Sequence, residues 1–290
     1  MPSGVIRTLP TIKNYQFFWG CVYNYKYLII VLLTMNERVY KKVKSILKQN
    51  GSRSSYIGED DFVSIVKGGI TINFHIKNPS LDIENIFRAV KRVQKIVKDK
   101  FNYVLEKIHI DIYDSMDEMR QDGRSRSKYA SWIAGIYDGN IRIISEKEDE
   151  EPESLYIILT HEIIHLVIDK TSSGLCPYWL DEGLAVYLSQ EIPAHYFNSL
   201  QEAVKKDKVL PLELLERHLS PDADENIRQL AYSEVSSITE YLVETYGWNT
   251  IKSIICQCVR RPFKTILSDL SLNYYLLEQG WKRWLKGKSA

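Results

Sequence analysis

HEIIH (His161–His165) and WLDEGLA (Trp179–Ala185) are the two segments from which the surrounding fold is predicted. The first segment is expected to lie in a helix, because Pro152 suits a first helical turn and apolar residues follow it at helical spacing. Gly174 marks the end of that helix and permits a tight turn. A second helix carrying WLDEGLA can then pack against the first.

Two histidines four positions apart predict a metal site. His161 and His165 would lie side by side on one helix face, where both imidazoles can bind one metal ion. Glu162 lies next to this pair without taking a coordination position, as a general base must. A catalytic zinc ion has three protein ligands and one water. Glu182, one turn into the second helix, is the predicted third ligand.

The same residues allow other interpretations. Asp181 or Cys176 could take the place of Glu182 as the third ligand. The motif could also be a helix with one buried and one exposed histidine, or a structural clip of two histidines on a metal ion. The Trp-Leu-Asp-Glu-Gly segment follows at a spacing that suits a third ligand, and it therefore favours a site of the zinc hydrolase type.

The two segments together resemble the gluzincin metallopeptidases, which have HExxH and a downstream glutamate ligand. WLDEGLA is similar to the Trp-Leu-Asn-Glu-Gly-Phe-Ala signature of zinc aminopeptidases. AYSEVSSITEYLVETYG (Ala231–Gly247) resembles the helix of those enzymes whose leading tyrosine, here Tyr232, stabilises the tetrahedral intermediate. Peptidase MA-like proteins show this combination, and WKRWL (Trp281–Leu285) matches their closing Trp-x-x-Trp-Leu helix. The resemblance covers roughly residues 60–286.

The resemblance implies a zinc-dependent peptidase with one Zn²⁺ per chain, held by His161, His165 and Glu182. Glu162 would take a proton from the attacking water and pass it to the leaving amine. Tyr232 would stabilise the oxyanion that forms on the peptide carbonyl. The expected partner is therefore a peptide or protein substrate.

Two departures from the aminopeptidases favour an endopeptidase. Their Gly-x-Met-x-Asn segment is absent between Ala130 and Glu151, and Ser189 stands where they usually carry a carboxylate. Asp181 is a candidate partner that orients an imidazole from outside the metal's ligand set. A surface or helix-terminus role for Asp181 is the alternative.

A non-catalytic protein that binds peptides or partners on a peptidase scaffold is the rival interpretation. Such a protein would be expected to have lost Glu162, a metal ligand or Tyr232, and the sequence retains all of them. A zinc enzyme that acts on another kind of bond is a third interpretation, since the spacing of ligands does not specify the substrate.

The predicted fold class is α+β with a thermolysin-like architecture. A small mixed or antiparallel sheet and a long helix form the N-terminal half, the metal-site helix follows, and the C-terminal half is all helical. The long helix is expected at Leu81–Phe101, and strands are expected at Phe62–Val66, Ile70–Ile76, Ile108–Tyr113 and Ile141–Ile144.

Residues 130–145 predict two strands directly before the metal-site helix. Ala134, Gly135 and Ile136 are candidates for an exposed strand edge to which an extended peptide substrate is added. A plain hairpin that binds no ligand is the alternative.

Composition indicates an ordinary globular protein. The net charge of +1 gives no reason to expect a nucleic-acid partner. The spacing of the cysteines fits neither a metal site nor a disulfide framework, and reduced thiols in the cytoplasm are predicted. Cys176 is interpreted as a small buried side chain. The four cysteines are Cys21, Cys176, Cys256 and Cys258.

Residues 1–55 are expected to be an N-terminal extension and linker, for which disorder is one expectation. Residues 56–151 form a predicted β-rich subdomain and residues 152–290 a helical zinc-site subdomain, together one catalytic unit. The apolar run at Tyr27–Leu33 is shorter than the about 20 residues of a membrane-spanning helix. We favour a natural start at Met35. A weak membrane anchor within residues 17–34 is the alternative. Nothing in the sequence indicates the oligomeric state.

Overall fold

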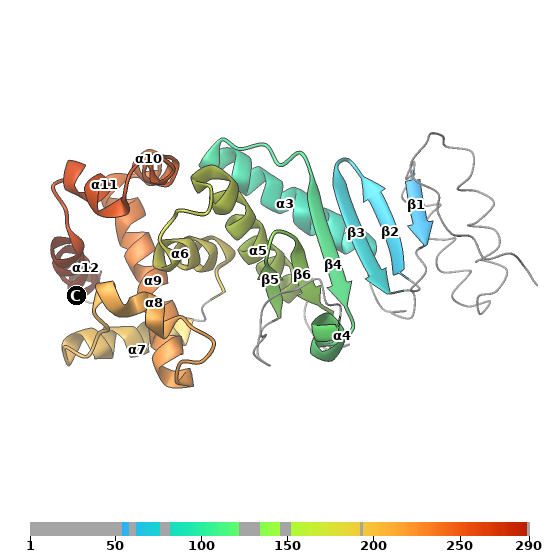
Figure 1. Cartoon of the computed structure of the whole chain (residues 1–290). Coiled ribbons are helices and arrows are strands. Elements are labelled where there is room, and N and C mark those ends of the chain that lie inside the picture. Colours follow the sequence, from blue (N-terminus) through green and yellow to red (C-terminus); the bar gives the residue numbers. More distant parts are fainter. Residues whose placement is uncertain are drawn as a thin grey trace, which may run out of the picture.

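The computed structural model describes residues 54–57, 62–75, 82–121, 134–145, 152–191 and 194–288. The fold is α+β, as predicted: a mixed sheet occupies the N-terminal half and helices make up most of the C-terminal half (Figure 1). Residues 17–34, for which a membrane anchor was the alternative interpretation, lie outside the described residues, as does Cys21. None of the described helices is long and apolar enough to cross a membrane.

The sheet has six strands in the order β1-β2-β3-β4-β6-β5. β3 pairs with β4 and β4 with β6 in parallel, whereas the other neighbouring strands are antiparallel. β5 is therefore the last strand on one side of the sheet. The strand bounds are β1 Ser54–Ile57, β2 Phe62–Lys67, β3 Ile70–His75, β4 Ile108–Tyr113, β5 Gly135–Tyr137 and β6 Ile141–Ile144.

Two helices cover one face of this sheet. α3 (Ile83–Phe101) connects the parallel strands β3 and β4, and Asp82 caps its first turn by accepting a hydrogen bond from the Asn85 amide. α5 (Pro152–Ser172) packs beside α3 and against β5 and β6. Sheet and helices share one buried core, which includes Ile72, Ile110, Val90, Val93, Ile163 and Val167. The face of α5 that points away from this core therefore lies at the edge of the sheet.

A short turn brings α6 (Tyr178–Ser189) back across α5. Ser173 and Gly174 both have left-handed backbones, with φ of 55° and 71°, and Pro177 precedes the first turn of α6. α6 also packs tightly on α9, since a Cβ at Gly183 would lie 2.7 Å from the Val235 carbonyl oxygen. Gly183 therefore allows the close approach of these two helices.

Most of the remaining helices pack on α9, whereas α4 packs against β4 and β6. Trp281 is fully buried and donates a hydrogen bond from Nε1 to Oγ of Ser237 at 3.0 Å, which anchors the last helix on α9. The bounds are α4 Met116–Gln121, α7 Ala194–Lys205, a 3-10 turn Leu212–Leu214, α8 Leu215–His218, α9 Glu225–Tyr246, α10 Trp248–Cys258, α11 Phe263–Asp269 and α12 Tyr274–Lys288.

The structure agrees with most expected elements and shifts some boundaries. The strands Ile108–Tyr113 and Ile141–Ile144 occur as predicted. The long helix begins two residues later than expected, because Asp82 serves as its cap. β1 begins at Ser54, inside the segment predicted to be a linker, because residues 54–57 pair with β2.

Candidate metal centre

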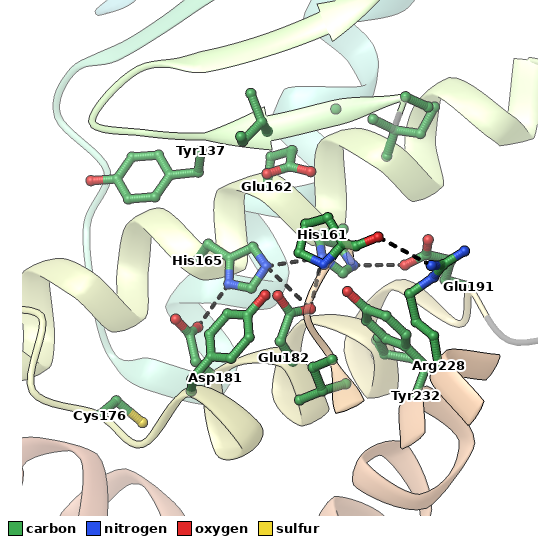
Figure 2. A pocket seen from close by; sticks show the side chains of 18 of the residues that line it. Tyr137, His161, Glu162, His165, Cys176, Asp181, Glu182, Glu191, Arg228 and Tyr232 are labelled. Carbon is green, nitrogen blue, oxygen red and sulfur yellow. Dashed lines mark hydrogen bonds and ion pairs between the residues drawn. The ribbon is translucent and has the colours of Figure 1, made fainter. Parts of the chain in front are cut away.

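A cleft of about 770 Å³ lies between the edge strand β5 and the helices α5, α6 and α9 (Figure 2). Its walls include the edge residues Ala134, Gly135 and Ile136 on one side and Tyr232 of α9 on the other. The predicted metal ligands line the same cleft. The structure thus brings the metal-site candidates and the predicted substrate edge into one cavity.

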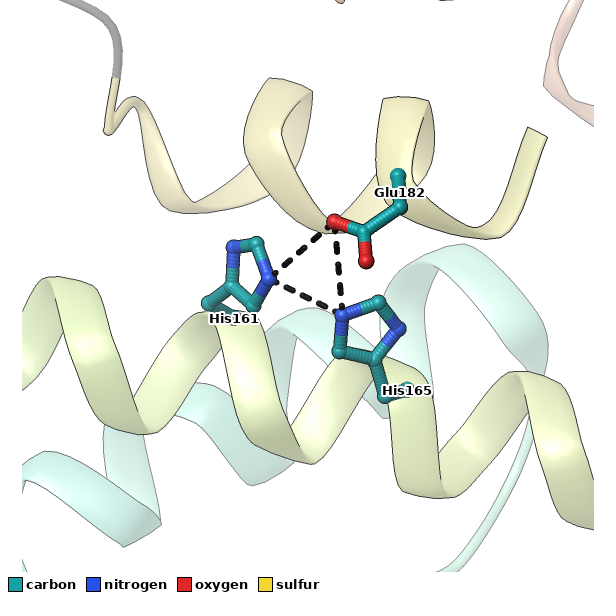
Figure 3. Close-up of side chains that lie close together, drawn as sticks. All are labelled: His161, His165 and Glu182. Atoms are coloured by element: carbon teal, nitrogen blue, oxygen red, sulfur yellow. Dashed lines mark hydrogen bonds and ion pairs between the residues drawn. The ribbon is translucent and has the colours of Figure 1, made fainter. Parts of the chain in front are cut away.

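Three side chains converge at the centre of this cleft (Figure 3). Nε2 of His161 and Nε2 of His165 lie 2.9 Å apart. Oε2 of Glu182 lies 3.6 Å from the first nitrogen and 3.8 Å from the second. The two imidazoles come from consecutive turns of α5, and the carboxylate comes from the facing side of α6.

These three atoms fit a zinc ion. A point equidistant from them lies about 2.0 Å from each, which matches the length of zinc–nitrogen and zinc–oxygen bonds. Oε2 of Glu182 is buried and has no hydrogen-bond partner among the described residues. A cation bound at this point would satisfy that oxygen and take a lone pair from each imidazole.

A second carboxylate supports each imidazole from behind. Oδ1 of Asp181 lies 2.8 Å from Nδ1 of His165. Oε2 of Glu191 lies 2.7 Å from Nδ1 of His161, as a close ion pair without the alignment of a hydrogen bond. Both contacts leave Nε2 as the metal-facing atom of each ring. Asp181 therefore lies where the sequence predicted a supporting residue.

The sequence analysis did not identify Glu191 as a residue of this site. Gln190 has a left-handed backbone with φ of 59° at the end of α6, and the chain turns there. Glu191, the next residue, reaches back to His161 of the candidate metal site. The sequence comparison placed the family's carboxylate at Ser189, which is buried and donates a hydrogen bond to the Val186 carbonyl. Only the chain path after α6 reveals the carboxylate two residues later.

The charges around the imidazoles favour a bound cation. Burial lowers the pKa of His161, but Glu191 and Glu182 outweigh it, and the net pKa lies well above the usual value. Burial also lowers the pKa of His165, whereas Asp181 and Glu182 raise it to about 9. Burial raises the pKa of Glu182, yet the two histidines bring it down to about 2. Protons and a metal ion compete for the same nitrogens, so metal binding would release protons.

Glu162 has the surroundings of a general base. It is 6% exposed, and burial raises the pKa of its carboxyl to about 7 against the opposing effect of His161 and His165. A Cβ on Gly135 would lie 2.9 Å from Oε1 of Glu162 and 2.7 Å from Cγ2 of Ile158. The missing side chain at Gly135 thus leaves room for the carboxylate between β5 and the metal site.

Two tyrosines line the cleft beside Glu182: Tyr178 is the first residue of α6, and Tyr232 comes from α9. Burial, followed by the negative charge of Glu182, raises the pKa of both Tyr232 and Tyr178. The Tyr178 side chain lies close enough to Glu182 and Tyr232 to interact with both. Both hydroxyls therefore stay protonated and can donate. Tyr178 was missed because it precedes the recognisable Trp-Leu-Asp-Glu-Gly segment.

Cys176 also lines the cleft but is not part of the group that could hold a metal ion, which consists of His161, His165 and Glu182 with their ligand atoms within 4.8 Å of one another. Among the described residues, that group is the candidate metal site with three ligand side chains.

A family model described as the peptidase MA superfamily matches residues 88–287. The chain belongs to this superfamily. The match begins inside α3 and extends through α12, so it contains every residue of the cleft described above. A search of curated proteins found no match. The peptidase MA superfamily assignment gives a peptidase-like scaffold that carries a possible His-His-Glu metal site.

Proposed function

We propose that this peptidase MA superfamily member is a zinc-dependent peptidase, and an endopeptidase rather than an aminopeptidase. The observation that carries the proposal is the placement of His161, His165 and Glu182 around one point, with the buried carboxylate of Glu162 beside them. One Zn²⁺ per chain is the proposed cofactor. When bound, zinc would polarise the substrate carbonyl and lower the pKa of a water in the site to ~7.

Glu162 is the proposed general base. Its pKa of about 7 suits a group that accepts a proton at neutral pH and returns it within one turnover. It would take the proton of the attacking water on a carboxylate oxygen. It would then deliver that proton to the nitrogen of the leaving amine.

Tyr232 is the proposed donor to the oxyanion. Its hydroxyl stays protonated because burial and nearby carboxylates raise its pKa. It faces the metal ligands across the cleft (Figure 2). A donor held in place before the reaction stabilises the negative charge that develops on the carbonyl oxygen.

The edge strand β5 is the proposed site for the substrate backbone. Ala134, Gly135 and Ile136 line the cleft, and Gly135 and Ile136 belong to β5, the last strand of the described sheet. An extended peptide that pairs with this edge would bring its scissile carbonyl towards Glu162, which lies against Gly135. The lack of the aminopeptidase Gly-x-Met-x-Asn segment supports cleavage within a chain rather than at its N-terminus.

The test begins with the metal content of purified protein, measured by elemental mass spectrometry. About one zinc per chain is expected. Zinc-loaded protein is then incubated with a mixed peptide library, with and without a chelator, and internal cleavage sites are read by mass spectrometry. Glu162→Gln should keep the zinc and lose activity by about 10²- to 10⁴-fold.

The outcomes distinguish an endopeptidase from a non-catalytic binding protein and from an aminopeptidase. Cleavage that persists in Glu162→Gln would remove the proposed mechanism. Protein that binds zinc and peptides but cleaves none would support the non-catalytic binding scaffold instead. Cleavage only at free N-termini would make the protein an aminopeptidase.

A further inference from the structure

Arg228 is a buried cation in the wall of the cleft. It lies in the first turn of α9, its side chain lines the cleft, and it is 9% exposed. Tyr232 follows four residues later, so the two side chains share one face of the helix, about 6 Å apart along its axis. Figure 2 shows both side chains extending from α9 into the cleft. Arg228 therefore lies next to the proposed path of the substrate.

The segment before α9 holds Arg228 in place. Its Nη1 donates hydrogen bonds to the main-chain carbonyls of Ala223 at 3.1 Å and of Pro221 at 3.5 Å. Between them, Asp224 caps the helix by accepting two amides of the first turn. These contacts fix the position of the guanidinium before a substrate binds, which lowers the entropy cost of binding an anion there.

A structural role is the alternative explanation of Arg228. In that role, the side chain would only hold the turn at Pro221 and Ala223 against α9. The two carbonyl hydrogen bonds need a donor but no positive charge, and a charge is costly to keep away from water. The placement of a charge on the cleft wall therefore points to a group that enters the cleft.

The other charges in the cleft limit where an acidic group can bind. Among the described residues that line the cleft, Arg228 is the one lysine or arginine. Six carboxylates line the same cleft and repel an anion elsewhere along it. An acidic group should therefore be accepted opposite Arg228 and disfavoured at other positions. The six carboxylates belong to Glu162, Asp169, Asp181, Glu182, Glu191 and Glu225.

We propose that Arg228 is a specificity-determining residue that binds a carboxylate of the substrate, either an acidic side chain or the C-terminal carboxylate. A planar guanidinium presents paired N–H donors that match the two oxygens of a carboxylate. In an extended peptide, side chains on one face recur about every 7 Å, which is close to the separation of Tyr232 and Arg228 along α9. The carboxylate should therefore lie one or two residues from the scissile bond. This inference rests on the proposed peptidase function, because it names the substrates of that site.

The experiment uses zinc-loaded full-length protein and peptides that differ in one group. The parent peptide is a sequence that the mixed library shows to be cleaved. One set has a blocked N-terminus and an amidated C-terminus and carries Glu or Gln at each position around the cleavage site. A second set carries Gln throughout and ends in a free carboxylate at different distances from that site.

At one position, kcat/KM for the Glu peptide should exceed that for the Gln peptide by about tenfold or more. Glu at other positions should lower kcat/KM. If only the second set shows the preference, the carboxylate is the C-terminal one. An acid that is favoured at no position, or at every position, would overturn the proposal without any variant.

Arg228→Gln separates the charge from the structural role. Gln keeps N–H donors for the two carbonyls but has no charge. The preference for the acid should disappear through a higher KM at unchanged kcat, while cleavage of the Gln peptide stays at the natural level. Arg228→Lys keeps the charge without the paired donors and should retain a weaker preference.

Arg217→Gln is the matched control, because Arg217 lies on α8, is exposed and is not among the residues that line the cleft. It removes the same charge, and the preference should remain. If the preference survives in Arg228→Gln or disappears in Arg217→Gln, the assignment to Arg228 is wrong.

Peptide binding separates this inference from the peptidase function. Zinc-loaded Glu162→Gln should bind the preferred Glu peptide more tightly than the Gln peptide by a similar factor, as measured by fluorescence anisotropy. Binding with this preference but without cleavage by the natural protein would count only against the peptidase function. Cleavage or binding without the preference would overturn only the role of Arg228. A protein that neither binds nor cleaves any of the peptides would overturn both.

Discussion

The helices α5 and α6 contribute to the same site in different ways. α5 presents His161, Glu162 and His165 within five residues, and helix geometry alone sets their spacing. α6 and the turn after it present Asp181, Glu182 and Glu191, whose distances to the imidazoles depend on how α6 packs against α5 and α9. The α5 part of the site should therefore tolerate changes in packing, while the α6 part should not.

Removing the one ligand supplied by α6 should have the largest effect. Glu182→Ala leaves two imidazoles, and catalytic zinc sites need three protein ligands. The zinc dissociation constant, measured by competition with a chelating dye, should rise by more than about 100-fold. That is the largest increase expected when a residue that only orients a ligand is lost. Activity should disappear with the metal. Unchanged zinc affinity would mean that Asp181 or Cys176 completes the site.

Tyr232→Phe should have the next largest effect, on turnover alone. Loss of one donor to an oxyanion costs about 10²- to 10³-fold in kcat. Zinc content should stay at the natural level, because Tyr232 is not a ligand. Tyr178→Phe is the matched control: Tyr178 lies beside Glu182, so its loss of a hydroxyl should change zinc affinity more than kcat. The reverse pattern would exchange the roles of the two tyrosines.

Asp181 contacts His165 from within α6, whereas Glu191 contacts His161 from the turn after α6. The variants Asp181→Asn and Glu191→Gln compare the effects of these two carboxylates on zinc affinity. Loss of such a carboxylate typically costs about 10- to 100-fold in metal affinity. The Asp181 side chain is 23% exposed and that of Glu191 is 50% exposed, so solvent screens Glu191 more. Asp181→Asn should therefore weaken zinc binding more. An equal or larger effect of Glu191→Gln would show that the turn after α6 is as well ordered as the helix.

Glu234 on α9 should affect stability and leave the site unchanged. Glu234 is fully buried, and its Oε1 accepts a hydrogen bond from the Leu210 amide at 2.9 Å. Burial raises the pKa of its carboxyl to about 8. Between the unfolded value of 4.5 and about 8, the folded state binds more protons than the unfolded state. The free energy of unfolding should fall as the pH rises through this window, by at most about 1.4 kcal/mol per pH unit.

Glu234→Gln should remove that slope, as followed by urea unfolding at several pH values. Gln keeps an oxygen for the Leu210 amide but does not titrate. Glu240→Gln, on the same helix but 30% exposed, should leave the slope in place. If the free energy of unfolding of Glu234→Gln still falls with pH over this window, another titrating group is responsible for the slope.

The elements that sequence analysis predicted well are those specified by local patterns. The helix through HEIIH, the second helix with Glu182, and the strands β4 and β6 all follow from spacing and turn residues within each segment. The proximity of Glu182 to both imidazoles also follows, because a short turn joins the two helices. Contacts that depend on distant segments were not predicted, among them the ion pair of Glu191 with His161.

The sequence by itself determined which residues of α5 form the candidate site, because two histidines four apart on a helix must share a face and a glutamate between them must lie beside it. Only the tertiary structure decided its surroundings. The parallel pairing of β3, β4 and β6 puts β5 at the sheet edge, where Gly135 makes room for Glu162. The close packing of α6 on α9 brings Tyr178 and Tyr232 together over Glu182. These relations depend on how separate segments fill shared space, which no local spacing encodes.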